Sequence, residues 1–327
     1  MYWDINKTLS YNCLFNFIIG NRGGGKTYGF KKRAIDNYLK KGSQFVYVRR
    51  YDTEFDHIET FFDDISEAYP ELEFKVKDGK FFINDEIAGW YIALTKAILL
   101  KSVPFPGVTM IGFDEFIIET GVYHYLKNEV RLFLDLYSSI ARDRDVIVFF
   151  MANAITITNP YFIYFNINLP YGKKIKSYKA KNETLIELVE DAELIEEKKQ
   201  TRFGKLISNT DYGAYAIENK FLLDDKKFIE KKTPESKNTF SFIYRGVRYG
   251  VWDDFNAGKQ FVSEDYDPSN KLIYTITLED HSPNTMLIKG RKSVIIDAFL
   301  RNYRMGNVRF ETMQIKNICA DMIKLFL

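Results

Sequence analysis

The eight residues from Gly20 to Thr27 read Gly-Asn-Arg-Gly-Gly-Gly-Lys-Thr and fit G-x-x-x-x-G-K-[ST], the pattern of a phosphate-binding P-loop. In such a loop, glycines let backbone N–H groups curl around the phosphates of a nucleotide. Lys26 would reach the β- and γ-phosphates, and the Thr27 hydroxyl would bind Mg²⁺. The motif predicts ATP and Mg²⁺ as cofactors. The residues that would line the phosphates are Gly20, Asn21, Arg22, Gly23, Gly24, Gly25, Lys26 and Thr27.

A second pair of chemically useful residues is Asp114-Glu115, which directly follows the apolar segment 108–113. An apolar strand that ends in Asp-Glu is the Walker B pattern, and its carboxyl end would face the phosphate loop. Asp114 would then help to hold Mg²⁺, and Glu115 would polarise the attacking water. The pair therefore favours hydrolysis of ATP over mere binding.

The polar residue Asn153 follows another apolar segment, 146–151. Neighbouring parallel strands place their carboxyl ends in one crevice, so this side chain would reach the γ-phosphate or the attacking water as a sensor. The alternative is an ordinary turn asparagine.

Two arginines, Arg142 and Arg144, stand at the end of an amphipathic segment expected to be helical over 128–141. Cations suit a helix C-terminus, so both could simply compensate the dipole and form surface ion pairs. Alternatively, one of them is an arginine finger that enters the nucleotide site of a neighbouring subunit. The residues alone leave both readings open.

Clusters of basic residues could contact the phosphates of a nucleic acid, although each could also be a solvated face. Because the net charge is only +2, any nucleic-acid site must be a local patch or be concentrated by assembly into a ring. Arg49 and Arg50 follow a predicted strand, and Lys101, upstream of the Walker B strand, could face either nucleotide or DNA. The other candidates are Lys75, Lys77 and Lys80 at a hairpin tip, and Lys173, Lys174, Lys176, Lys179 and Lys181 within nine residues.

The composition is that of a soluble globular protein, with 46% hydrophobic and 28% charged residues in a chain of 327. There is no signal-peptide core and no apolar run of membrane-spanning length, so no membrane partner is expected. Cys13 and Cys319 are far apart and the three histidines are isolated. These residues predict a reducing, cytosolic compartment and no zinc site.

The first two-thirds of the chain alternate apolar strands with amphipathic helices, which predicts an α/β fold with a mostly parallel sheet covered on both faces. Apolar spacing predicts strands over 15–19 and 44–48, helices over 28–40 and 52–68, and a hairpin over 74–90 that turns at Asp78-Gly79. The strongly charged run 183–199 is expected to be a helical connector or a solvated face.

The last hundred residues show a different pattern of predicted elements. Short strands are predicted over 239–244, 247–252, 260–263 and 272–278, followed by two helices, the first capped by Ser293 and stopped by Gly306 and the second starting near 311. A strand meander followed by helices predicts a separate, smaller α+β domain.

With these features in place, the chain resembles the DNA packaging motor ATPases of phi29-like bacteriophages along nearly its whole length. The most specific strings are Gln-Phe-Val-Tyr-Val-Arg-Arg-Tyr at 44–51 and Thr-Arg-Phe-Gly at 201–204. Further matches are Asn-Phe-Ile-Ile-Gly at 16–20, Ala-Gly-Trp at 88–90, Phe-Asp-Glu-Phe at 113–116, Asn-Ala at 153–154, Asn-Pro-Tyr-Phe at 159–162 and Gly-Val-Trp at 250–252.

The resemblance implies a P-loop ATPase domain of the additional-strand (ASCE) type over 1–195, terminase-like and related to HerA-FtsK translocases. A linker or lid would follow over 196–230, and a vestigial RNase H-like nuclease domain over 231–327. The subunits would form a pentameric ring at the portal vertex of the empty capsid, in the host cytoplasm. There they would drive double-stranded DNA inward by ATP hydrolysis, with the portal and, in some members, a structural packaging RNA as partners.

Residue by residue, Lys26, Thr27, Asp114, Glu115 and Asn153 match the nucleotide-site pattern of that family. Arg142 best matches its trans-acting arginine finger, with Arg144 as the alternative. The chain departs from the family by Thr27 in place of a serine and by Ile117-Ile118 where an arginine is expected.

The spacing of the C-terminal acids does not suggest a two-metal centre, so no nuclease activity is expected; these acids are Asp253, Asp254, Asp265, Asp267, Glu279 and Asp280. The rival interpretation of the P-loop is a nucleotide or small-molecule kinase. A GTPase switch is less favoured because the chain has no Asn-Lys-x-Asp motif. A purely structural capsid protein does not account for the intact Walker residues.

Overall fold

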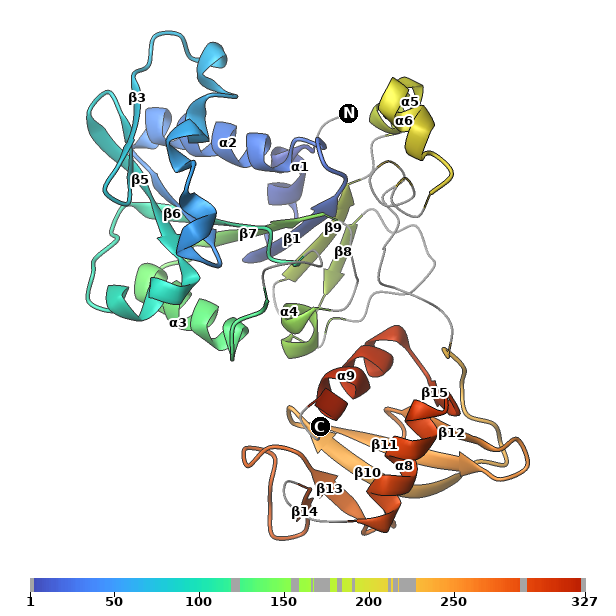
Figure 1. Cartoon of the computed structure of the whole chain (residues 1–327). Coiled ribbons are helices and arrows are strands. Elements are labelled where there is room, and N and C mark those ends of the chain that lie inside the picture. Colours follow the sequence, from blue (N-terminus) through green and yellow to red (C-terminus); the bar gives the residue numbers. More distant parts are fainter. Residues whose placement is uncertain are drawn as a thin grey trace. The chain divides into compact units, whose positions relative to one another are not determined.

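The structure is a computed structural model that describes residues 3–118, 124–153, 159–165, 167, 177–180, 184–189, 192–210, 213, 217, 228–288 and 293–324. The chain divides into two compact units (Figure 1). The first comprises Met1–Thr156 and Gly172–Leu223, and the second comprises Ile157–Tyr171 and Asp224–Leu327.

In the described part of the first unit, nine strands form one sheet in the order β3-β4-β5-β2-β6-β7-β1-β9-β8. The six strands from β5 to β9 in this order pair in parallel, and only the edges are antiparallel. The predicted mostly parallel sheet is thereby confirmed. The strands are β1 Phe15–Gly20, β2 Gln44–Arg49, β3 Phe74–Lys77, β4 Lys80–Ile83, β5 Glu86–Ala93, β6 Val108–Asp114, β7 Ile147–Ala152, β8 Ser177–Ala180 and β9 Thr184–Val189.

Strand β7 lies between the P-loop strand β1 and the Walker B strand β6. An inserted strand at this place is the defining feature of the additional-strand ATPases. The insertion brings the residue after β7 to the carboxyl ends of the strands, where the P-loop and the Walker B acids also lie.

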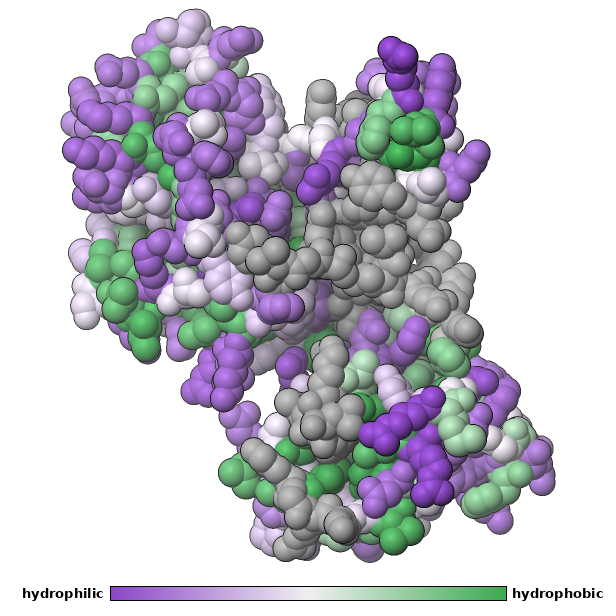
Figure 2. All heavy atoms as spheres, in the orientation of Figure 1, coloured by the Kyte–Doolittle hydropathy of each residue, from purple (hydrophilic) through white to green (hydrophobic). Residues whose placement is uncertain are grey.

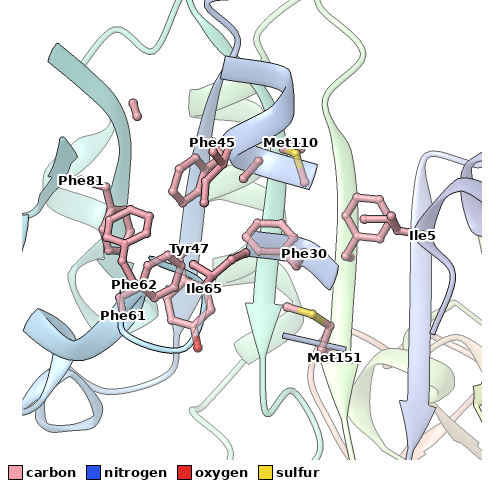
Figure 3. Packing of buried hydrophobic residues seen from close by; sticks show 14 of the residues in the cluster. Ile5, Phe30, Phe45, Tyr47, Phe61, Phe62, Ile65, Phe81, Met110 and Met151 are labelled. Carbon is pink, nitrogen blue, oxygen red and sulfur yellow. The ribbon is translucent and has the colours of Figure 1, made fainter. Parts of the chain in front are cut away.

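One face of the sheet is covered by α2 (Lys26–Lys41), which begins inside the P-loop and ends before Gly42. Phe30 of α2 points into a cluster of aromatic and sulfur-containing side chains from the strands, including Phe45, Tyr47, Met110 and Met151 (Figure 3). The close approach requires glycine at Gly112 in β6, because a Cβ there would lie 2.6 Å from the Phe30 ring. Packing of α2 on the sheet therefore sets the position of the P-loop.

The opposite face is covered by α3 (Glu129–Ala141), as Figure 1 shows. Phe133 of this helix stacks on Phe113 at 5.6 Å and contacts Phe150 at 4.8 Å between ring centroids. Phe150 in turn stacks on Phe17 at 4.5 Å. These rings tie the P-loop strand, the Walker B strand and β7 into one rigid block.

The hairpin turn at Asp78-Gly79 is confirmed, with φ of 51° and 78° as a type I′ turn requires. A second turn with positive φ at Asn84 and Asp85 adds β5 to the sheet.

The helix predicted over 52–68 is wrong: the segment folds as three 3₁₀ turns, η1 Asp52–Phe55, η2 Ile58–Phe62 and η3 Ser66–Ala68. Phe55, Phe61, Phe62 and Ile65 are buried, as the apolar spacing requires, but short i→i+3 turns are sufficient to bury them.

The charged run 183–199 also folds differently from the expected helical connector. Its first part is β9, which pairs with β1 and buries Glu187, whose carboxylate accepts a hydrogen bond from Thr8 Oγ1 at 2.5 Å. Only its second part is helical, as α5 (Ala192–Gln200), followed by α6 (Arg202–Ile207). Among the described residues of the first unit, the remaining helices are α1 Ile5–Ser10 and the 3₁₀ helix η4 Leu94–Leu100.

The second unit has its own hydrophobic core and, among its described residues, a six-stranded sheet in the order β14-β13-β10-β11-β12-β15. An antiparallel meander β10-β11-β12, extended by parallel strands on the β10 side, is an RNase H-like arrangement. The elements are α4 Pro160–Tyr164, β10 Lys237–Tyr244, β11 Val247–Asp254, β12 Lys259–Ser263, β13 Ile273–Thr275, β14 Met286–Leu287, α8 Val294–Arg304, β15 Val308–Phe310 and α9 Met313–Lys324.

Sequence spacing identified β10 to β13 and both helices, including the Ser293 cap of α8, but missed the very short strands β14 and β15. The division into two units places 157–171 with the C-terminal domain, and it groups 172–223 with the first unit. The domain boundaries expected at 195 and 230 stay predictions.

Candidate nucleotide site

The P-loop joins β1 to α2 with the backbone geometry that its glycines predict. Gly23 and Gly25 have φ of 80° and 76°, a left-handed conformation that other residues rarely adopt. Lys26 is the first residue of α2, and its Nζ donates to the carbonyls of Gly20 at 2.9 Å and Asn21 at 2.8 Å. The lysine is thereby folded back over the loop where the phosphates of a nucleotide would lie.

Burial lowers the pKa of Lys26 to about 8, against the opposing effect of Asp114, and the nearby cations Lys198 and Arg22 lower it further. A bound polyphosphate would act in the opposite direction and stabilise the charged amine. The loop is therefore built to favour an anionic ligand.

The Walker B carboxylate Asp114 ends β6 opposite the start of α2. Its Oδ2 accepts hydrogen bonds from Thr27 Oγ1 at 2.9 Å and from the Tyr47 hydroxyl at 2.8 Å. Thr27 and Asp114, which lie far apart in the sequence, thus meet as a hydroxyl and a carboxylate. These are hard oxygen donors of the kind that Mg²⁺ prefers, so the residues present fit the ion.

Glu115 follows with a positive φ of 57°, which turns its side chain away from the strand. The side chain is about half exposed, and its Oε2 lies 3.1 Å from Arg49 Nη2. The same guanidinium lies 3.2 Å from the buried Glu54 and 3.8 Å from Asp114. Arg49, which the sequence suggested as a nucleic-acid contact, instead holds the acidic residues of the site.

Arg50 is also not a surface residue, because it is 2% exposed. Its Nε and Nη2 bind the two carboxylate oxygens of Glu129 at 2.7 and 2.9 Å. The guanidinium further donates to the carbonyls of Glu115 at 3.1 Å and Phe116 at 2.9 Å. A buried bidentate pair thus fixes the backbone that follows the Walker B acids, a role that local sequence could not reveal.

Asn153 follows β7 as predicted, and its Oδ1 lies 3.5 Å from Lys26 Nζ. It lines a cavity of about 910 Å³ together with the P-loop, Asp114 and Glu115. Residues of α1 and α2 also line the cavity, as does Trp3, which precedes α1 and whose backbone N–H donates to the Gly24 carbonyl at 3.1 Å. The N-terminal segment is a wall of the site that the sequence interpretation did not anticipate.

The two arginines after α3 have different surroundings. The Arg144 guanidinium donates to the carbonyls of Phe105, Pro106, Val108 and Ile140 at 2.7–2.8 Å. It is therefore engaged as a structural cap of α3 and β6, which speaks against its use as a finger. Arg142 is exposed at the C-cap of α3, with φ of 53°.

The lysines expected to contact nucleic acid divide into two groups. Lys75 and Lys77 are exposed on β3, Lys80 on β4 is half-buried, and Lys101 is exposed just after η4. Figure 2 shows mostly hydrophilic side chains over the end of the first unit that carries β3. Lys173, Lys174, Lys176 and Lys181 lie outside the described residues, and Lys179 belongs to β8.

In the C-terminal unit, the adjacent strands β10 and β13 contain no Asp or Glu, and β11 ends in Asp253 and Asp254. Several of the predicted acids instead support turns: Asp280 accepts from the Arg245 and Gly246 N–H groups, and Asp254 accepts from Ala257 N–H. Across the described part of the chain, no group of three His, Cys, Asp or Glu side chains could hold a metal. That this domain lacks nuclease activity stays a prediction.

The additional-strand sheet, the P-loop and the Thr27–Asp114 pair together define a P-loop nucleotide-binding protein. More narrowly, the chain belongs to the Podovirus DNA encapsidation protein (Gp16) family, whose model matches residues 1–326. It is 37% identical over 330 residues to the DNA packaging protein of Bacillus phage phi29, covering 99% of this chain and 97% of that protein.

Two solved structures extend the similarity to the fold. The bacteriophage phi29 viral genome packaging motor assembly matches with a TM-score of 0.82 at 36% identity, covering 100% of this chain and 99% of that one. The N-terminal domain of the DNA packaging ATPase from phi29 matches with a TM-score of 0.54 at 37% identity, covering 57% of this chain and 95% of that one. In the parts of the chain that are described, no helix is long and apolar enough to span a membrane.

Proposed function

We propose that this chain is the ATP-hydrolysing subunit of a phage DNA packaging motor, which drives double-stranded DNA into a preformed capsid. The observation that carries the proposal is the contact of Thr27 with Asp114 at 2.9 Å, with Glu115 as the next residue. This pair meets at the carboxyl ends of parallel strands, beside a loop whose lysine is folded over the phosphate position. Family membership supports DNA packaging as the purpose of the hydrolysis.

In the proposed mechanism, Lys26 and the loop amides bind the phosphates. Thr27 and Asp114 would hold Mg²⁺, which would supply neutralisation of the negative charge that develops on the phosphates. Glu115 orients the attacking water and accepts its proton, and Asn153 contacts the γ-phosphate from β7. Arg49 and Tyr47 hold the Walker B carboxylates in place during this step.

Arg142 is suited to act on the site of a neighbouring subunit. Arg142 precedes β7, and Asn153 follows β7 at the end of the sheet where the P-loop lies. Arg142 therefore lies at the other end of the strands, about 20 Å from its own P-loop, the length of a six-residue strand. The neighbouring η4 packs against α3 and exposes Ile98 and Leu99 at 63% and 73%. Exposed apolar side chains on an element that packs against α3, whose C-cap is the exposed Arg142, support a subunit interface on this side of the unit.

We further propose that the subunits form a ring at the portal vertex of the capsid. The family resemblance implies that this ring is a pentamer. Exposed Lys75, Lys77 and Lys101 are the described candidates for contacts with DNA phosphates. A ring multiplies each lysine into a circle of positive charge, which offsets the small net charge of one chain. The portal protein, and a packaging RNA in the case of phi29-like assembly, are the expected partners.

Steady-state ATP hydrolysis measured against protein concentration, with and without double-stranded DNA, tests the proposal. Turnover per subunit should rise with concentration and rise further with DNA, because sites shared between subunits form only on assembly. If the free protein does not assemble, the same assay with procapsids should restore both effects. Turnover that stays proportional to protein and indifferent to DNA, even with procapsids, would support a kinase-like enzyme instead.

A further inference from the structure

The segment that follows β9 contacts the P-loop at two points. Lys198 Nζ on α5 donates a hydrogen bond to the carbonyl of Arg22, and Asn21 Nδ2 donates to the carbonyl of Ile217 at 2.8 Å. β9 directs the chain to this place, because its last residue, Val189, pairs with Gly20 in β1. A region expected to be a linker or lid therefore lies against the middle of the phosphate loop.

The corner between α5 and α6 is built to hold Lys198. Thr201 caps α6 by accepting from Gly204 N–H at 2.9 Å, and its hydroxyl donates to the Lys198 carbonyl at 2.7 Å. Gly204 allows α6 to approach, because a Cβ there would lie 1.8 Å from the Lys198 carbonyl oxygen. The Thr-Arg-Phe-Gly string thus has a physical role: it forms a tight corner at Lys198.

The charged form of Lys198 is electrostatically unfavourable at this position unless an anion binds beside it. Burial and the neighbouring Arg22 lower the pKa of Lys198, and Lys198 and Arg22 in turn lower that of Lys26. Two cationic side chains of the P-loop itself, Arg22 and Lys26, and Lys198 from α5 thus lie close together beside the same backbone amides. Phosphate oxygens are the ligand that this combination favours.

We propose that Lys198 is a second phosphate-binding cation, which reaches the terminal phosphate of ATP from the α5–α6 corner and so makes the position of this corner depend on a triphosphate. The inference rests on the proposed nucleotide site. The terminal phosphate is assigned because the amides at the start of α2 bind the α- and β-phosphates, whereas Arg22 and Gly23 lie earlier in the loop. Arg22 and Gly23 also line the cavity that contains Glu115.

The test compares the affinities of the full-length chain for a non-hydrolysable ATP analogue and for ADP, each with Mg²⁺, by calorimetry. Lys198→Ala should weaken the analogue about tenfold, the loss expected for one charge-assisted hydrogen bond, and change ADP binding less than twofold. Lys198→Arg should restore most of the loss. Lys199→Ala is the matched control, because this lysine pairs with Glu196 on the same helix, and it should bind both nucleotides like the wild type.

Gly204→Ala is a second, indirect variant, since the added methyl group must push α6 away from Lys198. It should reproduce the selective loss for the triphosphate while leaving the lysine in place; if it does not fold, Lys198→Ala and Lys198→Arg still decide the matter. Equal weakening of both nucleotides by Lys198→Ala, or none, overturns the proposal. Failure of the wild-type chain to bind any nucleotide would instead overturn the proposed function, so the two failures are distinguishable.

Discussion

The guanidinium of Arg49 lies 3.1 Å from the carboxylate of Glu115, so the last residue of β2 holds the residue that follows β6. The two strands are neighbours in the sheet, and the same guanidinium contacts Asp114 and Glu54. The acid proposed to activate water is therefore restrained by a residue from a neighbouring strand. The first substitution to test at Glu115 is therefore one that removes its charge and keeps the size of its side chain.

Glu115→Gln should bind ATP with near wild-type affinity but hydrolyse it at least about a hundredfold more slowly, because the amide cannot accept the proton of the attacking water. Single-turnover hydrolysis and analogue binding, measured on the same preparation, separate the two effects. Wild-type turnover of this variant would remove Glu115 from its catalytic role.

Arg142→Ala should abolish hydrolysis in a homogeneous ring yet leave each subunit able to bind ATP. When these subunits are mixed with Glu115→Gln subunits, activity should reappear, since some interfaces then combine an intact Glu115 with an intact Arg142 from the neighbour. Mixing the two inactive preparations and measuring turnover against their ratio is the experiment.

The control for this complementation is Arg144→Ala. Because Arg144 binds four backbone carbonyls, this variant should lose thermal stability and should not be rescued by mixing. Absence of rescue for Arg142→Ala would mean that this arginine acts within its own subunit or only structurally.

Glu129→Gln should destabilise the first unit by about 3–5 kcal/mol, because it removes the carboxylate charge that balances the buried guanidinium of Arg50. Arg50→Lys should not be tolerated well either, since an ammonium group cannot replace the bidentate contact. Denaturant unfolding of the full chain measures the loss. Lys96→Ala, which removes the exposed pair with Asp52, should shift stability by less than about 1 kcal/mol.

Affinity for ATP should fall as the pH rises through about 8, the pKa to which burial lowers Lys26 in the free protein. Below that pH the amine is already charged, so binding needs no proton; above it, the bound phosphates must draw a proton onto the lysine. Calorimetry near pH 9 in two buffers of different ionisation enthalpy should detect this proton uptake. Lys26→Arg should remove the pH dependence, because arginine stays charged throughout.

The lowered pKa of Lys26 also makes the free energy of unfolding of the nucleotide-free protein depend on pH. The folded pKa of Lys26 lies below its unfolded value of 10.5, so the folded state binds fewer protons between the two values. The cost of burying the charged amine is therefore present below about pH 8 and is relieved as the pH rises toward 10.5. Thermal melting of wild-type and Lys26→Gln chains across this range checks the sign.

The chemistry carried by consecutive residues was predictable from the sequence. A P-loop and an Asp-Glu pair are local patterns, and the apolar segments before them predict the strands that position them. The parallel sheet, the hairpin at Asp78-Gly79 and the separate C-terminal domain follow from spacing and turn residues of the same local kind. Helix-like spacing over 52–68 was misleading, because it reports which side chains are buried and not which backbone hydrogen bonds form.

Only the tertiary structure determines which residues each charged side chain contacts. Arg49 and Arg50 look alike in sequence, yet one holds Glu115 and the other is buried against Glu129, 79 positions away. The part of the charged run that contains Glu187 forms a strand between β1 and β8, because pairing with β1 and the hydrogen bond from the hydroxyl of Thr8 outweigh its local polarity. Lys198 meets the P-loop for a similar reason. Contacts between distant residues depend on how strands are ordered in the sheet, and no local window of sequence contains that order.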